Sequence, residues 1–382
     1  MTTQSPAGAA PSGATSIPFF DGATQTSQLL PEIQHAIARV IQSQRFILGE
    51  EVAAFEAEIA NYLGVRHAIG VSSGTDALTL SLLALGIGPG VEVITTPYTF
   101  FATTGAILRV GATPVFVDIE RDGFNLDAEA VERAITLRTR AILPVHLFGQ
   151  AADMGALRDV AARHSLSLIE DAAQALGAGF GGERVGSLGH IACFSFFPTK
   201  NLGAFGDGGL VATSDDALAE AVRALRNHGF SPKHHSRRVG GNFRLDALQA
   251  AILRTKLPHL ARWNALRSDH ARRYLEAFAA LGGLILPRAL PGREHVYNQF
   301  VVRSAQRDGL AAWLTERGVG TEQYYPFPIH LQEACAHLAH RPGDFPNAEA
   351  AARESLALPI FPELDEQAQG IVIRRVLEFF TR

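Results

Sequence analysis

One stretch decides how the rest of the chain is interpreted: Ala192-Cys193-Phe194-Ser195-Phe196-Phe197-Pro198-Thr199-Lys200-Asn201-Leu202-Gly203. It places Lys200 directly after a run of apolar and aromatic residues, and a glycine-rich segment follows it. Burial among apolar side chains disfavours an ammonium group and lowers its pKa. A neutral amine can attack a carbonyl carbon and form a Schiff base. A lone lysine of this kind more often extends from a loop into water, so the interpretation depends on the residues that accompany it.

About thirty residues upstream, a short apolar run from residue 166 ends in two carboxylates, Glu170 and Asp171. Short apolar runs are typical of parallel strands that are covered on both faces, and open α/β sheets bind ligands at the carboxyl ends of such strands. Alone, Asp171 could simply cap a helix. Together with Lys200 it suggests pyridoxal phosphate, in which an acidic group keeps the pyridine nitrogen protonated. At ~4 Å and a dielectric constant near 20 this attraction is roughly 4 kcal/mol, or about three pKa units.

Two motifs, Glu170-Asp171-Ala172-Ala173-Gln174-Ala175 and Ser195 to Gly203, resemble those of the DegT/StrS-type sugar aminotransferases. The resemblance extends from about Ile17 to the C-terminus. It implies the α/β fold of type I pyridoxal-phosphate enzymes, with a large domain around a mainly parallel, seven-stranded sheet and a smaller C-terminal α/β domain. Lys200 and Asp171 would then be the catalytic residues.

Apolar runs alternate with helical patterns along the first two thirds of the chain, which favours a doubly wound, mainly parallel sheet. We expect a disordered arm over residues 1–16, because Ala, Ser, Thr, Gly and Pro dominate it. Residues 17–245 should form the large domain and residues 246–382 the small one. Pro31 is expected in the first turn of a helix, where its missing N–H costs nothing.

The resemblance also implies cofactor contacts. Gly74 and Thr75 begin a helix after a predicted strand, where free N–H groups favour a phosphate, although an ordinary strand–helix turn looks the same. Ser195 would contact the same phosphate. Gln174 would hydrogen-bond the phenolic oxygen of the cofactor. Phe100 would stack on the pyridine ring, or could equally belong to the core.

Other residues would contact the substrate or a second subunit. Asn242 would reach the cofactor phosphate of a neighbouring subunit, which implies a homodimer with shared active sites; by itself it is only a good residue for starting a helix. Tyr325 and His330, in a segment rich in proline and aromatic residues, are candidates for sugar contact. His146 follows a predicted strand and could line the site. Each of these three side chains could instead be structural.

The activity implied is transamination of a nucleotide-diphosphate-linked keto-sugar, with L-glutamate as the amino donor. Segments 145–150 and 324–326 resemble members that act at carbon 3 of a keto-6-deoxyhexose, with carbon 4 as the alternative. Some relatives with this fold are dehydratases that carry histidine in place of the lysine, and Lys200 argues against that activity. A non-catalytic sensor that binds pyridoxal phosphate is the other alternative.

Composition excludes several other classes. The formal net charge is −4 and no basic block is present, so a nucleic-acid surface is not expected. Cys193 and Cys335 lie far apart, which indicates neither a disulfide framework nor a metal site. No apolar run is long enough to cross a bilayer, and the N-terminus lacks the features of a signal peptide. We therefore expect a cytoplasmic protein without a metal ion or a membrane partner.

Overall fold

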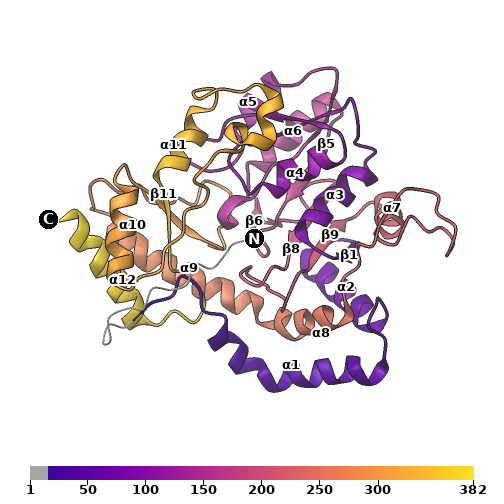
Figure 1. Cartoon of the computed structure of the whole chain (residues 1–382), viewed down its shortest axis with the longest axis horizontal. Helices are drawn as coiled ribbons and strands as arrows, with labels where there is room; N and C mark the ends of the chain where they lie inside the picture. Colours follow the sequence, from indigo (N-terminus) through magenta and orange to yellow (C-terminus); the bar gives the residue numbers. More distant parts are fainter. Residues whose placement is uncertain (1–15) are drawn as a thin grey trace.

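The computed structural model describes residues 16–382, so the arm predicted for residues 1–16 lies almost wholly outside it. A seven-stranded sheet forms the centre, in the order β1-β9-β8-β5-β4-β2-β3 (Figure 1). All strands run parallel except β9, which is antiparallel to both of its neighbours. The strands are β1 (His67–Val71), β2 (Glu92–Thr95), β3 (Thr113–Phe116), β4 (Thr139–Ile142), β5 (Ser167–Asp171), β8 (Ile191–Ser195) and β9 (Gly209–Thr213). The predicted fold class is confirmed.

Helices cover both faces of this sheet. One face packs against α3 (Gly74–Ala84), α4 (Ala102–Arg109) and α7 (Asp216–Arg226). The other packs against α2 (Glu50–Leu63), α5 (Ala128–Arg133), α6 (Met154–His164) and α8 (Ala247–Lys256), with α1 (Ala23–Ser43) lying along α8. Successive strand residues enter opposite layers: Leu168 packs in one and Ile169 in the other. Burial on both faces explains why the strands read as continuous apolar runs.

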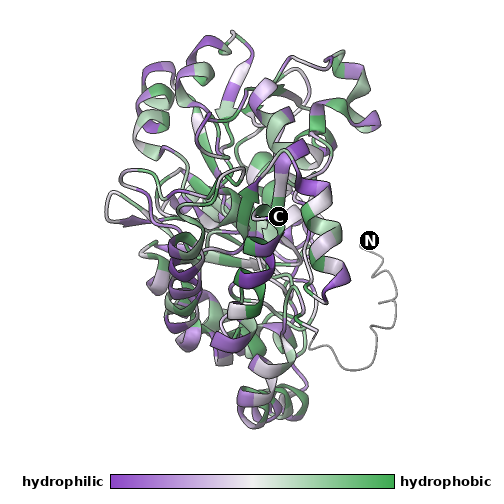
Figure 2. Ribbon diagram, turned by 90° about the vertical axis from the view of Figure 1, so that its left-hand side faces the viewer, coloured by the Kyte–Doolittle hydropathy of each residue, from purple (hydrophilic) through white to green (hydrophobic). Residues whose placement is uncertain are grey.

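The C-terminal part has its own core around a two-stranded antiparallel sheet of β10 (Phe300–Arg303) and β11 (Ser355–Leu358). Helices α9 (Leu260–Phe278), α10 (Arg307–Glu316), α11 (Pro346–Glu354) and α12 (Glu366–Phe380) surround it. Helix α9 contributes Trp263 to the large core and Tyr274 to the small one. Figure 2 shows hydrophobic residues concentrated in the interior and hydrophilic residues on the peripheral helices. The division between residues 245 and 246 stays a prediction.

The prediction for Pro31 was wrong, because α1 begins at Ala23 and Pro31 lies inside it. Asp21 stabilises the start of α1, which was not predicted from the sequence: its Oδ1 accepts the N–H of Ala23 at 2.8 Å. A proline inside a helix removes one backbone hydrogen bond. Leu29 and Ile33, which flank it, are both buried in the large core. Their burial favours continuing the helix through the proline.

Within residues 16–382, no helix combines the length and apolarity that crossing a bilayer requires. The same residues contain no cluster of three His, Cys, Asp or Glu side chains arranged to hold a metal ion. Both cysteines, Cys193 and Cys335, are buried free thiols.

Candidate active site

Asp171 is the last residue of β5, and Lys200 lies in the loop that follows the neighbouring strand β8. Strands β5 and β8 pair in parallel, with Asp171 opposite Cys193, so both end at the same edge of the sheet. Beyond β8 the chain turns, and the N–H of Lys200 donates to the carbonyl oxygen of Phe197 at 2.8 Å. Burial lowers the pKa of Lys200 from 10.5 to about 8, while the charge of Asp171 opposes this shift. A larger fraction of this lysine is therefore neutral near pH 7 than of an exposed one.

The Asp171 carboxylate is buried but hydrogen-bonded. Thr103 Oγ1 donates to its Oδ2 at 2.7 Å, and the N–H of Ala173 donates to its Oδ1 at 3.2 Å. Burial raises the pKa of Asp171, and these two hydrogen bonds and the charge of Lys200 oppose the increase. Sequence reasoning missed Thr103. It lies in the first turn of α4, 68 positions before Asp171, and nothing in the local pattern links the two.

Gln174, Tyr325 and Phe100 lie together beside this pair. The N–H of Phe148 donates to Gln174 Oε1 at 2.7 Å, which leaves Gln174 Nε2 to donate to Tyr325 Oη at 3.1 Å. The ring of Tyr325 lies 6.1 Å from that of Phe100, measured between centroids. Phe100 is 59% exposed and therefore presents a free aromatic surface. Two residues predicted from the large domain and one from the small domain thus meet in space.

Gly74 and Ser195 form a cradle at the start of α3. A Cβ atom on Gly74 would lie 2.7 Å from Ser195 Cβ, so the backbone approaches Ser195 as only glycine allows. Ser73 caps the helix, its Oγ accepting the N–H of Asp76 at 3.1 Å. The N–H groups of the first helical turn have no intrahelical acceptors. With the Ser195 hydroxyl they provide donors that suit a phosphate group.

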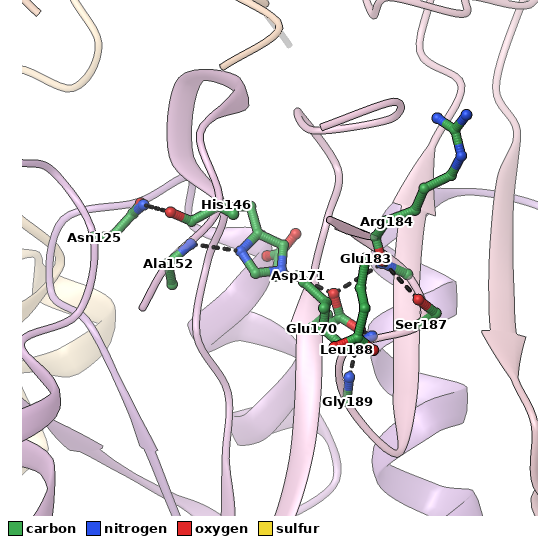
Figure 3. Close-up of polar contacts among 12 residues, drawn as sticks. Asn125, His146, Ala152, Glu170, Asp171, Glu183, Arg184, Ser187, Leu188 and Gly189 are labelled. Carbon is green, nitrogen blue, oxygen red and sulfur yellow. Dashed lines mark hydrogen bonds and ion pairs between the residues drawn. The ribbon is translucent and has the colours of Figure 1, made fainter. Parts of the chain in front are cut away.

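His146 lies in a separate, fully buried contact with Glu170 (Figure 3). Its Nδ1 accepts the N–H of Ala152 at 3.0 Å, so Nε2 carries the proton and donates to Glu170 Oε2 at 3.0 Å. The Glu170 carboxylate also accepts three backbone N–H groups, those of Gly186, Leu188 and Gly189. Both ring nitrogens of His146 are therefore engaged. Its substrate contact stays a prediction, and this placement favours the structural alternative.

Replacing Glu170 with glutamine tests this contact. Four donors converge on the carboxylate, and an amide would turn its own N–H groups toward some of them. A buried donor left without its acceptor costs about 1–3 kcal/mol, so we expect the free energy of unfolding of the cofactor-free protein to fall by at least about that amount in a denaturant titration. Glu132→Gln, at an ion pair in which both side chains are about half exposed, should change it far less, because solvent screens an exposed pair. Equal effects of the two substitutions would contradict the assignment.

His330 and Asn242 lie apart from these contacts. His330 is buried, and its Nε2 interacts with Glu349 Oε1 at 3.2 Å. Burial lowers the pKa of His330. Asn242 is exposed, while the carbonyl oxygen of the next residue, Phe243, accepts the N–H of Ser72 at 3.0 Å. The backbone at Asn242 therefore lies close to the turn that precedes Gly74, and the Asn242 side chain is exposed to solvent.

A lysine with a lowered pKa beside a strand-end carboxylate can bind an aldehyde cofactor covalently, and the cradle at Gly74 and Ser195 fits a cofactor phosphate. Fold and site together define the class: a pyridoxal-phosphate-dependent transferase of fold type I. Within that class, the chain belongs to the DegT/DnrJ/EryC1/StrS aminotransferase family, whose model matches residues 28–377.

Two relatives and one solved structure illustrate the similarity. A "pleiotropic regulatory protein" of Geobacillus stearothermophilus is 50% identical, over 95% of this chain and 98% of that protein. The dTDP-3-amino-3,4,6-trideoxy-alpha-D-glucose transaminase of Streptomyces venezuelae is 48% identical, over 96% and 97%. The crystal structure of S. venezuelae DesV in complex with a ketimine intermediate superposes with a TM-score of 0.94 at 48% identity, covering 96% of this chain and 99% of that one.

Proposed function

We propose that this protein transfers an amino group from L-glutamate to a nucleotide-diphosphate-linked keto-sugar. The observation that carries the proposal is Lys200, with its lowered pKa, beside the strand-end carboxylate of Asp171. The sugar class is supported by the 48% identical transaminase, whose name describes an amino sugar linked to dTDP. That name places the amino group at carbon 3. We therefore assign a 3-keto-6-deoxyhexose or a related sugar, with the carbon-4 ketone as the alternative.

Lys200 would hold pyridoxal phosphate through Nζ, and Asp171 would pair with its ring nitrogen. When bound, the cofactor supplies an electron sink that stabilises negative charge at the substrate carbon. In this dry site the Asp171 carboxylate acts more strongly on a neighbouring positive charge than it would in water. The other predicted cofactor contacts are Gly74, Thr75 and Ser195 for the phosphate, Gln174 for the phenolic oxygen and Phe100 for the ring face.

Lys200 would also move the proton in each half of the reaction. Its Nζ takes a proton from the α-carbon of the donor and later returns one to the carbon of the sugar that gains nitrogen. A group with a pKa of about 8 can both accept and release a proton near neutral pH, which is what general acid–base catalysis requires.

We also propose a cytoplasmic homodimer with shared active sites. Three large aromatic side chains remain exposed in loops of the site: Phe100 at 59%, Phe197 at 46% and Phe205 at 42%. Contiguous exposed apolar surface is typical of interaction sites, and these three residues lie in the loops that follow β2 and β8. The exposed side chain of Asn242 is free to reach a second copy, as the resemblance implies.

A substrate screen tests the proposed activity. The purified protein is incubated with L-glutamate and a panel of dTDP- and UDP-linked 3-keto and 4-keto sugars, and the products are identified by NMR. We expect amination at carbon 3, and none by Lys200→Ala protein. A product aminated at carbon 4 would replace the assigned position. If glutamate left the absorbance of the bound cofactor unchanged and no sugar were consumed, the sensor alternative would hold, with which the name of the G. stearothermophilus relative agrees.

A further inference from the structure

Three buried asparagines meet beside Lys200: Asn201, Asn264 and Asn298, with exposures of 6%, 8% and 5%. They come from three separate segments. Asn201 follows Lys200 directly, Asn264 lies in α9, and Asn298 lies just before β10. Burying an amide is costly unless its polar atoms find hydrogen-bond partners, so the partners of these side chains show what the cluster holds together.

The side chain of Asn201 is bonded at both ends. Its Nδ2 donates to Asn264 Oδ1 at 2.6 Å and to the carbonyl oxygen of Val296 at 3.3 Å. Its Oδ1 accepts from Asn298 Nδ2 at 2.8 Å. An amide with both N–H groups donated and its oxygen occupied has one favourable orientation. These hydrogen bonds to buried partners therefore fix the position of the Asn201 side chain, and with it the Asn201 Cα atom.

Helix α9 supplies the fixed frame for this contact. Asn264 Nδ2 donates to the carbonyl oxygen of Leu176 at 3.0 Å, which lies two residues after Gln174. One turn further along, Arg267 Nη1 donates to the carbonyl oxygens of Tyr297 and Asn298 at 3.2 and 3.3 Å. The same helix thus binds Asn201, the segment after Gln174 and the segment before β10.

The loop that carries Lys200 is also held on its other side. The N–H of Ala204 donates to the carbonyl oxygen of Phe196 at 2.8 Å, which closes the loop. Lys256 Nζ donates to the carbonyl oxygen of Gly203 at 2.7 Å. Residues 197–199, just before Lys200, are exposed. Asn201 is therefore the buried side chain nearest to Lys200 in the loop. It restrains the peptide bond that joins Lys200 to Asn201.

We propose that Asn201 is a positioning residue: held by Asn264 and Asn298, it fixes the backbone at Lys200 so that Nζ faces Asp171. This inference rests on the proposed role of Lys200 in holding the cofactor. A misplacement of about 1 Å of a reacting group can cost on the order of 100-fold in rate, so a loose loop would slow every step that uses Nζ. A merely structural amide cluster would affect stability alone.

Asn201→Asp is the sharpest test, because it keeps the shape and removes both N–H groups. A carboxylate oxygen would then face Asn264 Oδ1 and the carbonyl oxygen of Val296. The readout is the rate at which cofactor-free full-length protein captures added pyridoxal phosphate, followed by visible absorbance and by mass spectrometry of the borohydride-reduced Lys200 peptide. We expect this rate to fall about tenfold or more. Asn61→Asp, the same change at an exposed position in α2, should leave it unchanged.

A second variant and a second readout separate positioning from stability. Asn298→Asp leaves Asn201 in place but removes the N–H group that donates to Asn201 Oδ1. We therefore expect a smaller loss of capture rate than for Asn201→Asp. If Asn201→Asp yields too little folded protein, the Asn298→Asp variant provides the test instead. The pH midpoint of the bound cofactor's absorbance should shift in both variants. Lower melting temperatures with parental capture rates and midpoints would overturn the proposal. Failure of the parental protein to capture the cofactor would instead refute the proposed function.

Discussion

Lys200→Ala protein should lose transamination and the visible absorbance of the bound cofactor together. The substitution removes the covalent anchor and also the group assigned to proton transfer, which alone contributes roughly 10²–10⁴-fold. With both roles lost, we expect turnover to fall by at least about 10⁴-fold. The measurements are steady-state rates with glutamate and the keto-sugar, and absorbance spectra of protein to which pyridoxal phosphate has been added.

The small number of lysines makes this test selective. The chain has only three: Lys200, Lys233 and Lys256. Reduction of the loaded protein with borohydride should leave the cofactor attached to Lys200, identified by peptide mass spectrometry. Lys233→Ala, in the polar loop after α7, should still carry the label on Lys200. Parental turnover by the Lys200→Ala protein, or a label on Lys233 or Lys256, would remove the basis of the assignment.

The lowered pKa of Lys200 also predicts a dependence of stability on pH. Burial lowers the pKa of the folded state to about 8 against 10.5, so between these values the unfolded chain binds more protons than the folded one. The free energy of unfolding of cofactor-free protein should therefore rise with pH across this window. Lys256, whose pKa burial also lowers to about 8, contributes in the same direction. Lys200→Ala protein should show a smaller rise, measured by denaturant titration at pH 7 and pH 10.

Asp171→Asn should produce the second-largest loss. An amide of the same shape keeps the packing but carries no charge to stabilise a protonated ring nitrogen. The attraction that is lost is roughly 4 kcal/mol at ~4 Å, which corresponds to about a thousandfold in rate. We expect kcat to fall by that order, while covalent capture of pyridoxal phosphate by Lys200 persists. Single-turnover kinetics with glutamate measure the fall, and reduction with borohydride confirms capture.

Asp215→Asn is the matched control for this substitution. Asp215 caps α7 at an exposed position, its Oδ1 accepting the N–H groups of Ala217 and Leu218, and asparagine is an equally good cap. Its activity should stay within a factor of about two. If Asp171→Asn protein worked as fast as the Asp215→Asn control, the carboxylate would have no electrostatic role.

Much of the architecture was predictable because its signals are local. Runs of apolar residues are typical of strands covered on both faces, and the run that begins at residue 166 forms β5. The start of α1 was not predictable from Pro31, because buried neighbours on both sides extend the helix past it. A carboxylate at a strand end pointed to Asp171, and an amine after an apolar run pointed to Lys200. Both signals can be read from neighbouring residues.

By itself, the sequence determined the alternation of strands and helices and the family, and it led to the proposal that Lys200 and Asp171 carry the chemistry. Only the tertiary structure decided which side chains support them. Thr103 reaches Asp171, Asn264 and Asn298 hold Asn201, and Glu170 engages both His146 and a distant loop. These partners are 16 to 97 positions apart in the chain. Contacts at such separations depend on how the layers pack, and no local periodicity encodes them.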